Sequence, residues 1–392
     1  GAARARLGEA TSAFYPRVGV RFSYARTDNP AEAFGMIVAQ RGFSPVLDVN
    51  DPGSTENYRP ELHGAFNLFR GGQDHHFREA ARHGLEATEQ ERSALRNALA
   101  DAVTATFFAH LAAQEQVAVA QASVQAVESE LAEARKRFDA GAVLKSDVLS
   151  LEVRLAAAKE GRVRARNAVD HAKAGLRLLL ALGPEDPVEL DPGVEDPAPG
   201  VPTKIAEALA AGLSGRPELR AAAQMTEVRR SEREAAKGLF LPRVDLFGSY
   251  GQDHDTFELD SDQDNWTFGV VVDLDLFSGF QKSERIRGAE RRLAEARALQ
   301  EKVRLQVEQE VTSAVLALDE SRERIGVTEK SVAAAEEALR LVREQYQAGT
   351  TTITRYLEAE VALADARSRS IAARFDARRA EAGVRKAVGF WK

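Results

Sequence analysis

The chain has 392 residues, enough for two or three globular domains, and its 44% hydrophobic and 29% charged residues are typical of a folded protein. A formal net charge of −7 argues against a nucleic-acid-binding surface, and the absence of cysteine excludes disulfides, thiolate metal sites and cysteine nucleophiles. The apolar run LRLLLALG at 176–183 is far too short for a transmembrane helix. The opening GAARARLGEA is typical of the end of a helix, so we expect a segment to precede Gly1, and the lack of a signal peptide says nothing about location.

An internal duplication organises the sequence. The segment LFRGG at 68–72 aligns with LFSGF at 276–280, and later segments keep the same offset of 208 positions (276 − 68). Upstream, FYPRVGVRFSY from residue 14 aligns with FLPRVDLFGSY from residue 240, an offset of 226, so the first copy carries 18 additional residues (226 − 208). They fall in segment 26–57, which we expect to form a long polar loop. We therefore predict two structural repeats, residues 1–192 and 193–392.

Each repeat is predicted to contain a helix, two strands separated by a loop, a very long helix, a tight turn and a second helix. The predicted elements are, in chain order, strands at about 15–25 and 58–69, a helical hairpin at about 71–181, strands at about 242–252 and 265–277, and a hairpin at about 279–388. The first helix of each hairpin covers about 67 residues without proline, roughly 100 Å, which indicates a coiled coil or a tunnel wall. Periodicity alone does not distinguish these hairpins from an ordinary antiparallel coiled-coil hairpin. The Pro/Asp/Gly-rich segment 183–202 reads as a linker between the repeats.

The strand segments alternate between apolar and polar residues. In NWTFGVVVDLDLF, for example, Trp266, Phe268 and Val270 share one face, and Thr267 and Gly269 share the other. Each segment has about ten residues, the length of a tilted membrane strand. Aromatic residues lie near the strand ends, as in interfacial girdles; they are Tyr15, Tyr24, Tyr250, Trp266 and Phe277.

A soluble sheet with one wet face has the same period, but the sequence offers no amphipathic element to cover its apolar face. In lipid, four strands leave two open edges, which is not tolerated, so the sheet is expected to close with other chains.

The two hairpins turn at similar motifs, RFDAGAVLKSDVL and YQAGTTTITRYLEAE. An aromatic residue stands three positions before a glycine in both, and Gly141 and Gly349 are again 208 positions apart (349 − 141). We expect a positive φ or a close backbone approach at these glycines.

Together these motifs resemble the outer-membrane efflux channels of the TolC family, the outer-membrane factors, over nearly the whole chain. The resemblance implies a mainly α fold with a membrane β-sheet. Three chains would form one α-barrel and contribute four strands each to one 12-stranded transmembrane β-barrel. An equatorial segment at about 183–215, together with the C-terminus, would form a collar. The implied protein is a passive homotrimeric exit duct of a tripartite efflux pump or type I secretion system, in the outer membrane of a Gram-negative bacterium with a periplasmic helical extension. Its partners would be outer-membrane lipid and a periplasmic adaptor (membrane fusion protein), and through the adaptor an inner-membrane pump.

The resemblance also implies roles for residues of the turns, which would be periplasmic tips opened by an iris-like relaxation of one helix pair. The tip and adaptor-contact residues would be Gly141, Ala142, Val143, Leu144, Ser146, Gly349, Thr350 and Thr352. Asp147 and Tyr346 match a hydrogen-bonded pair that holds similar channels shut. Thr351 stands where well-known members have a locking arginine. Arg355 and Glu358 stand where members have two acidic rings, so a mixed ring replaces a cation-selective constriction, unless Arg355 is only a solvated helix charge.

Other chemistry has weaker support. Asp74, His75, His76 and His83 have poor metal-ligand spacing for one helix face and read as solvated residues at the head of a long helix. The acids Asp253, Asp255, Asp260, Asp262 and Asp264 are interpreted as a solvated external loop, with weak calcium binding there as the less favoured alternative. No nucleotide-binding, zincin or serine-hydrolase motif is present, so we expect no enzyme and no cofactor or metal. The main rival is a periplasmic coiled-coil adaptor or structural protein, which two complete hairpins and duplicated strands disfavour.

Overall fold

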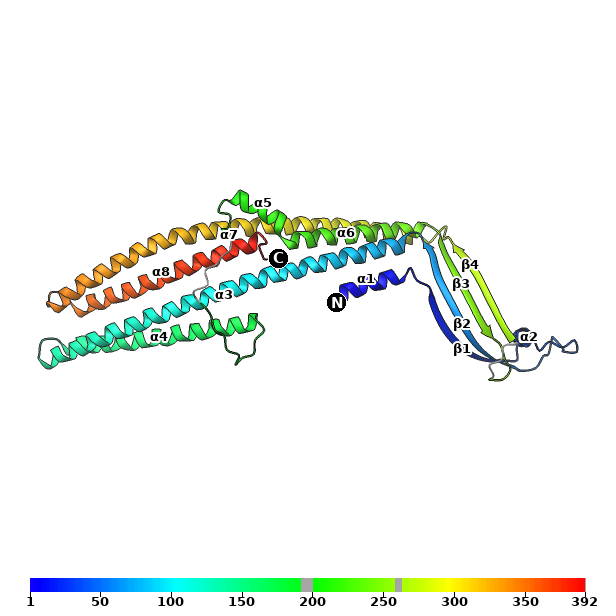
Figure 1. The fold of residues 1–392 in the computed structure, drawn as a ribbon, viewed down its shortest axis with the longest axis horizontal. Coiled ribbons are helices and arrows are strands. Elements are labelled where there is room, and N and C mark those ends of the chain that lie inside the picture. Colours follow the sequence, from blue (N-terminus) through cyan, green and yellow to red (C-terminus); the bar gives the residue numbers. More distant parts are fainter. Residues whose placement is uncertain (192–199, 258–262, 392) are drawn as a thin grey trace. The chain divides into compact units, whose positions relative to one another are not determined.

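The computed structural model describes residues 1–191, 200–257 and 263–391, and is mainly helical with one four-stranded antiparallel sheet (Figure 1). The chain divides into two compact units. Unit 1 comprises Gly1–Glu89 and Arg220–Glu301, and unit 2 comprises Gln90–Leu219 and Lys302–Lys392. In the described part of the chain, no helix has both the length and the apolar character needed to cross a membrane.

Two long helices begin in unit 1 and end in unit 2. They are α3 (Gln73–Asp139) and α7 (Gln281–Gln347), each of 67 residues. Each is followed after a short turn by a helix of 35 residues, α4 (Lys145–Leu179) or α8 (Ile353–Ala387). Because corresponding helices have equal lengths and start 208 positions apart (281 − 73), the duplication of the sequence extends to its secondary structure.

Unit 1 contains the sheet. Besides the first parts of α3 and α7, unit 1 contains four strands: β1 (Arg17–Thr27), β2 (Thr55–Arg70), β3 (Arg243–Gln252) and β4 (Asp264–Asp273). It also contains α1 (Ala2–Ser12), α2 (Pro30–Ala39), α6 (Pro217–Lys237, which starts in unit 2) and the 3-10 turn η1 (Gly238–Phe240). The strands lie in sequence order, β1-β2-β3-β4, with a β-bulge in β2 between Asn67 and Phe69. The two central strands therefore come from different repeats, and β1 and β4 are the edges.

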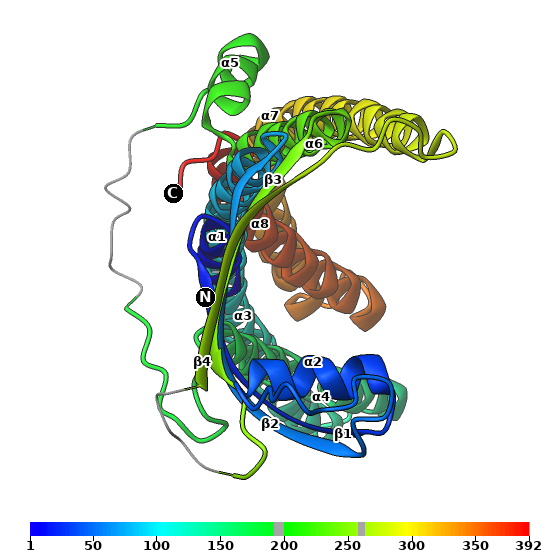
Figure 2. The ribbon, with the colours of Figure 1, turned by 90° about the vertical axis from the view of Figure 1, so that its right-hand side faces the viewer.

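The register places the alternating apolar residues of all four strands on one face. Val20 pairs with Leu62, Leu62 with Tyr250, and Tyr250 with Trp266. This face is uncovered, with Val20 80% and Trp266 75% exposed. The opposite face carries the polar residues, and the sheet curves so that one side is concave (Figure 2).

The segment between β1 and β2 is not the continuous polar loop that the sequence predicted. Strand β1 extends to Thr27, β2 begins at Thr55, and helix α2 forms between them. Pro30 at the first turn is compatible with a helix start, and the side chain of Asn29 caps it by accepting a hydrogen bond from the Ala31 N–H at 3.1 Å. This N-cap is a local helix signal, but it lies in a segment whose overall composition is typical of a loop.

The joint between β2 and α3 depends on glycine. A Cβ on Gly71 would lie 2.1 Å from the Gly238 carbonyl oxygen, and a Cβ on Gly238 would lie 2.3 Å from that of Gly71. Gly71 also has φ +60°. Gly71 and Gly238 thus let two backbones touch where strand β2 passes into helix α3.

Near the middle of its long helices, unit 2 carries the short helix α5 (Ile205–Gly215), which lies within the predicted equatorial segment; residues 192–199 of that segment lie outside the described residues. Its Ala208 packs in a buried cluster with Val307, Val311, Val315, Leu318, Val384 and Ala387 of α7 and α8. The buried Arg216 guanidinium bonds Glu218 at 2.9 Å and Glu310 at 2.8 Å. The segment after the linker is therefore tied to α7 by both packing and charge.

Candidate functional site: the hairpin tips

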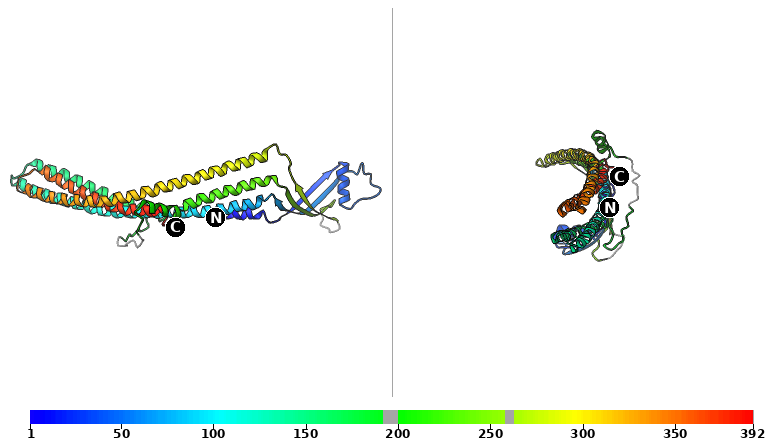
Figure 3. Two further views of the ribbon diagram at one scale, coloured as in Figure 1. Left: turned by 90° about the horizontal axis from the view of Figure 1, so that it is seen from above. Right: turned by 90° about the vertical axis from the view of Figure 1, so that its left-hand side faces the viewer.

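The two tight turns of unit 2 have the same backbone geometry, and both lie at one end of the unit (Figure 3). In the first turn, the Gly141 N–H donates to Phe138 O at 2.8 Å, and the Ala142 N–H donates to Arg137 O at 2.8 Å. The equivalent bonds of the second turn, to Tyr346 O and Gln345 O, measure 3.1 and 2.9 Å. This pair of bonds is the Schellman helix end.

The glycines have φ +74° at Gly141 and +73° at Gly349, the positive value that the sequence predicted. A Cβ at either position would meet nothing within 4 Å. Glycine is therefore needed at these positions for its conformation, and the alternative of a close backbone approach does not apply.

Behind the turns, all four helices of unit 2's hairpins share one buried core. Its members are Val127, Leu131 and Ala134 of α3, Val148 and Leu151 of α4, Tyr346 of α7, and Ile353 and Tyr356 of α8. The rings of Tyr346 and Tyr356 stack with centroids 5.7 Å apart. The two hairpins are thus joined to each other near their tips.

A buried ion pair crosses this core from one hairpin to the other. Arg154 of α4 donates to Glu360 of α8 from Nε at 3.0 Å and from Nη2 at 2.5 Å. The Ser123 hydroxyl of α3 donates to the other Glu360 oxygen at 2.5 Å. The Glu360 side chain is only 5% exposed and that of Arg154 21%, so water screens the pair weakly.

A second buried carboxyl lies beside the tyrosines. Glu130 of α3 is 3% exposed, and its nearest cationic partner, Arg343, lies 3.9 Å away. Burial raises the pKa of Glu130 above its ordinary value, and burial also raises the pKa of Tyr356 to about 12. The tip core thus favours neutral forms at Glu130 and Tyr356 and carries one strong ion pair, at Glu360.

Tyr346 is buried, but in the described residues its hydroxyl has no hydrogen-bond partner. The structure therefore does not contain the Asp147–Tyr346 hydrogen bond that the resemblance implies. Asp147 lies in the first turn of α4, and its charge, after burial and Glu130, raises the pKa of Tyr346. The two residues are close enough to interact, and their direct bond remains a hypothesis.

The other predicted gate residues are at the start of α8. Thr352 is the N-cap, and its side chain accepts a weak bond from the Arg355 N–H at 3.4 Å. Arg355 pairs with Glu358 one helical turn away at 3.8 Å, and both side chains are more than half exposed. The Thr350 hydroxyl donates to Gln345 O at 3.0 Å, and Thr351 follows it directly before the N-cap. These residues are accessible, unlike those of the core behind them.

The predicted tip residues of the first turn are also accessible. Leu144 is the N-cap of α4 without a side-chain cap bond, and it is 70% exposed. The Ser146 hydroxyl, in the first turn of α4, donates to the carboxylate of its neighbour Asp147 at 3.4 Å.

Sequence reasoning missed Arg154, Glu360, Ser123 and Glu130. A signal existed for Glu360, because positions 353, 356, 360 and 363 form one buried helical stripe in α8. A carboxylate in such a stripe needs a partner. The partner could not be deduced from the duplication, because Glu152, the equivalent of Glu360, is exposed and pairs with Arg135 instead.

The residues considered for metal binding have other contacts. Asp74 lies 3.5 Å from Arg70, and His83 Nδ1 lies 2.8 Å from Gln224 Oε1. Asp253 is buried, so its assignment to a solvated loop was wrong, and Asp260 and Asp262 lie outside the described residues. Within the described ranges, no group of three or more potential ligands is placed to hold a metal ion.

Comparison with known proteins finds outer-membrane proteins that are similar to this chain both in sequence and in fold. The family model described as outer membrane efflux protein matches residues 1–182 and 209–390. The outer membrane protein OprJ of Pseudomonas aeruginosa is 27% identical over 293 residues, which cover 72% of this chain and 59% of OprJ. The outer membrane efflux protein BepC of Brucella suis is 24% identical over 340 residues, 80% of this chain and 74% of BepC. The crystal structure of the Campylobacter jejuni CmeC outer membrane channel superposes with a TM-score of 0.86 at 17% identity, covering 99% of this chain and 80% of CmeC.

Proposed function

The chain belongs to the outer membrane efflux protein family, and we propose that it is a passive trimeric channel, the exit duct of a tripartite efflux pump or type I secretion system. Membership places it in the outer membrane, with its helices extending into the periplasm. The relatives are channel proteins, and we assign this chain no catalytic role. Power for transport would come from an inner-membrane partner.

The observation that carries the proposal is the uncovered apolar face of the sheet. Alternate residues of four strands expose large apolar side chains, and lipid is the environment that makes such a surface favourable. The edge strands β1 and β4 have unpaired backbone groups along one side, which lipid cannot satisfy. Two further copies of the chain would supply the missing strand partners and close a 12-stranded barrel.

The tips are proposed as the gate and as the contact with a periplasmic adaptor. Gly141, Gly349 and the residues beside them, including exposed Leu144, would meet the adaptor. Opening would separate the two hairpins, so the Arg154–Glu360 pair and the stacked tyrosines resist it. Asp147, Tyr346, Thr351, Arg355 and Glu358 would line the aperture, where the mixed charges of Arg355 and Glu358 do not favour strong cation selectivity. The adaptor rival is disfavoured because the likeness to an outer-membrane channel includes the sheet and spans 99% of the chain.

A charge placed on each face of one strand tests the proposal. Val20→Lys puts a cation on the apolar face of β1, at an expected cost of about 2–4 kcal/mol if the site lies deep in the bilayer. Ser23→Lys puts the same cation on the polar face and serves as the matched control. We expect Val20→Lys to reduce the amount of detergent-extractable trimer in outer-membrane fractions, with little effect of Ser23→Lys. Equal effects of both, or a wild-type chain that is soluble without detergent, would overturn the proposal.

A further inference from the structure

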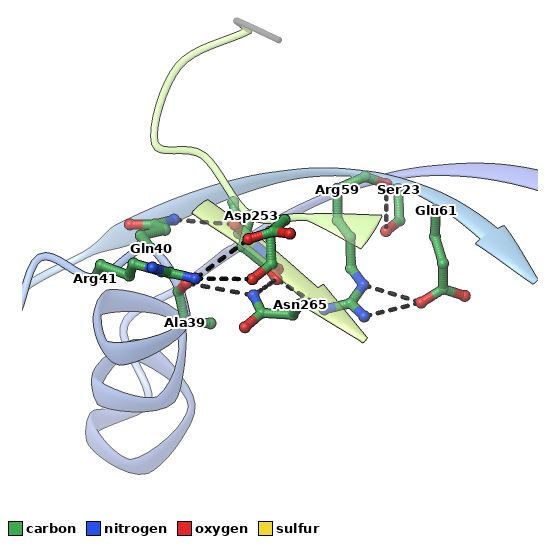
Figure 4. A network of polar contacts seen from close by, with 10 residues as sticks. Ser23, Ala39, Gln40, Arg41, Arg59, Glu61, Asp253 and Asn265 are labelled. Carbon is green, nitrogen blue, oxygen red and sulfur yellow. Dashed lines mark hydrogen bonds and ion pairs between the residues drawn. The ribbon is translucent and has the colours of Figure 1, made fainter. Parts of the chain in front are cut away.

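A buried polar network lies at the end of the sheet away from the long helices, entirely within unit 1 (Figure 4). At its centre is Asp253, which is 1% exposed. Its carboxylate accepts hydrogen bonds from Asn57 Nδ2 at 2.7 Å, from Arg59 Nη1 at 2.8 Å and from Asn265 Nδ2 at 2.9 Å. These donors come from β2 and β4, so one residue links both neighbours of β3 at this end.

The same network holds the C-terminal end of α2. Gln40 donates to Glu56 O at 2.7 Å and to Asn57 Oδ1 at 3.0 Å. Arg41 donates to Asp264 O at 3.0 Å and also contacts its carboxylate at 3.3 Å. Asn265 completes the contact with a bond to Ala39 O at 3.4 Å. Helix α2 is therefore bound to the sheet by side chains that reach both β2 and β4.

These contacts determine on which face α2 lies. Asn57, Arg59 and Asn265 occupy the register positions of the polar face, in line with Ala25, Ser23 and Gly251. The views agree, because α2 lies on the concave side of the sheet, next to β1 and β2 (Figure 2). In the proposed barrel the polar face surrounds the lumen, since the apolar face meets lipid.

We propose that α2 is a fixed constriction inside the outer mouth of the channel, latched by the Asp253 network; this rests on the proposed function. The channel then has a narrow point at the mouth of the barrel, in addition to the proposed gate at the helix tips. In the latch, Gln40 and Asn57 are buried, whereas the Arg41–Asp264 pair is partly exposed. Together these bonds hold α2 in place without any partner. The surface at this place is apolar in part, because Val38 of α2 is 47% exposed and Phe43, in the segment after the helix, is 54% exposed. Solutes leaving the barrel therefore pass an apolar helix as well as the charged strand residues.

Because the chain has no cysteine, the position of α2 can be tested with single thiols. Val38→Cys places a thiol on the exposed part of α2, and Val20→Cys places one on the lipid-facing side of β1 as the matched control. The purified channel in a planar bilayer is treated with a bulky, charged methanethiosulfonate reagent. We expect a loss of conductance with Val38→Cys, reversed by reductant, and no change with Val20→Cys. Unchanged conductance with Val38→Cys would place α2 outside the lumen and overturn the proposal.

The latch is tested by a release variant. Gln40→Ala with Arg41→Ala removes the bonds that these two side chains make to β2 and β4, and leaves Asp253, its strand partners and the weaker Asn265–Ala39 bond intact. Arg26→Ala is the control, because Arg26 bonds Ser54 and Glu56 in the same region without touching α2. We expect a larger conductance in the release variant alone. Wild-type conductance in that variant would refute the latch, while failure of the wild-type protein to conduct at all would refute the proposed function instead.

Discussion

The ion pair between Arg154 and Glu360 gives the most quantitative prediction for the tips. Arg154→Met keeps the bulk of the side chain and leaves the Glu360 carboxylate buried with only the Ser123 hydroxyl as partner. Removing one partner of a buried pair typically costs 3–5 kcal/mol, and partial exposure of Arg154 puts the expected cost at the lower end, about 3 kcal/mol. Since each 1.4 kcal/mol is a factor of ten, local separation of the hairpins becomes roughly 100-fold more frequent.

Hydrogen exchange of the backbone amides of α8 near Glu360 measures this separation in the detergent-purified channel. Arg355→Met is the matched control, because its pair with Glu358 is exposed and worth only about 0–0.5 kcal/mol. Replacing both partners, as in Arg154→Met with Glu360→Leu, should restore most of the protection, since no unpaired charge remains. The reasoning is refuted if Arg154→Met exchanges like Arg355→Met, or if the double variant exchanges as fast as the single one.

Three further outcomes follow from the tip geometry. Burial raises the pKa of Glu130, so in the folded chain its carboxyl group stays protonated above its ordinary pKa of 4.5. The stability of the folded chain therefore falls as the pH rises from 4.5 to the raised pKa. Glu130→Gln should remove that fall, and should raise the melting temperature at pH 7 more than at pH 4. Gly349→Ala should cost about 1 kcal/mol from its positive φ alone, whereas Gly326→Ala inside α7 should stabilise by about 0.5–1 kcal/mol, and equal denaturation midpoints would contradict this. Tyr346→Phe removes a hydroxyl that has no partner among the described residues, so it should leave the denaturation midpoint unchanged or raise it, and a clear loss would reveal a bond such as the one to Asp147.

Periodicity and internal alignment were enough to predict the four strands and the two long helical hairpins. The alternation in NWTFGVVVDLDLF identified β4 and its apolar face, and the repeated glycine turns located the ends of α3 and α7. These features are local, because a few neighbouring residues are enough to determine a period of two or a turn at a glycine.

What could not be predicted depends on partners far away in the sequence. Asp253 looked like one acid of a solvated loop, but its partner Asn57 is 196 positions away. Glu360 is 206 positions from Arg154, and the duplicated equivalent of Glu360 has a different partner. Helix α2 was missed for another reason, since its only start signal is the short Asn29–Pro30 cap within a segment of loop-like composition. The residues near each of these side chains in the sequence do not indicate which distant charge it meets.

Single-channel conductance in a planar bilayer, compared between the detergent-purified wild-type protein and Arg154→Met, tests whether the chain is a channel with its gate at the helix tips. We expect discrete conductance steps for the wild type, and larger or more frequent steps for the variant, in which the hairpins separate more easily. Identical steps in both would contradict a gate at the helix tips. A wild-type protein that stays soluble without detergent and never inserts would contradict the channel itself.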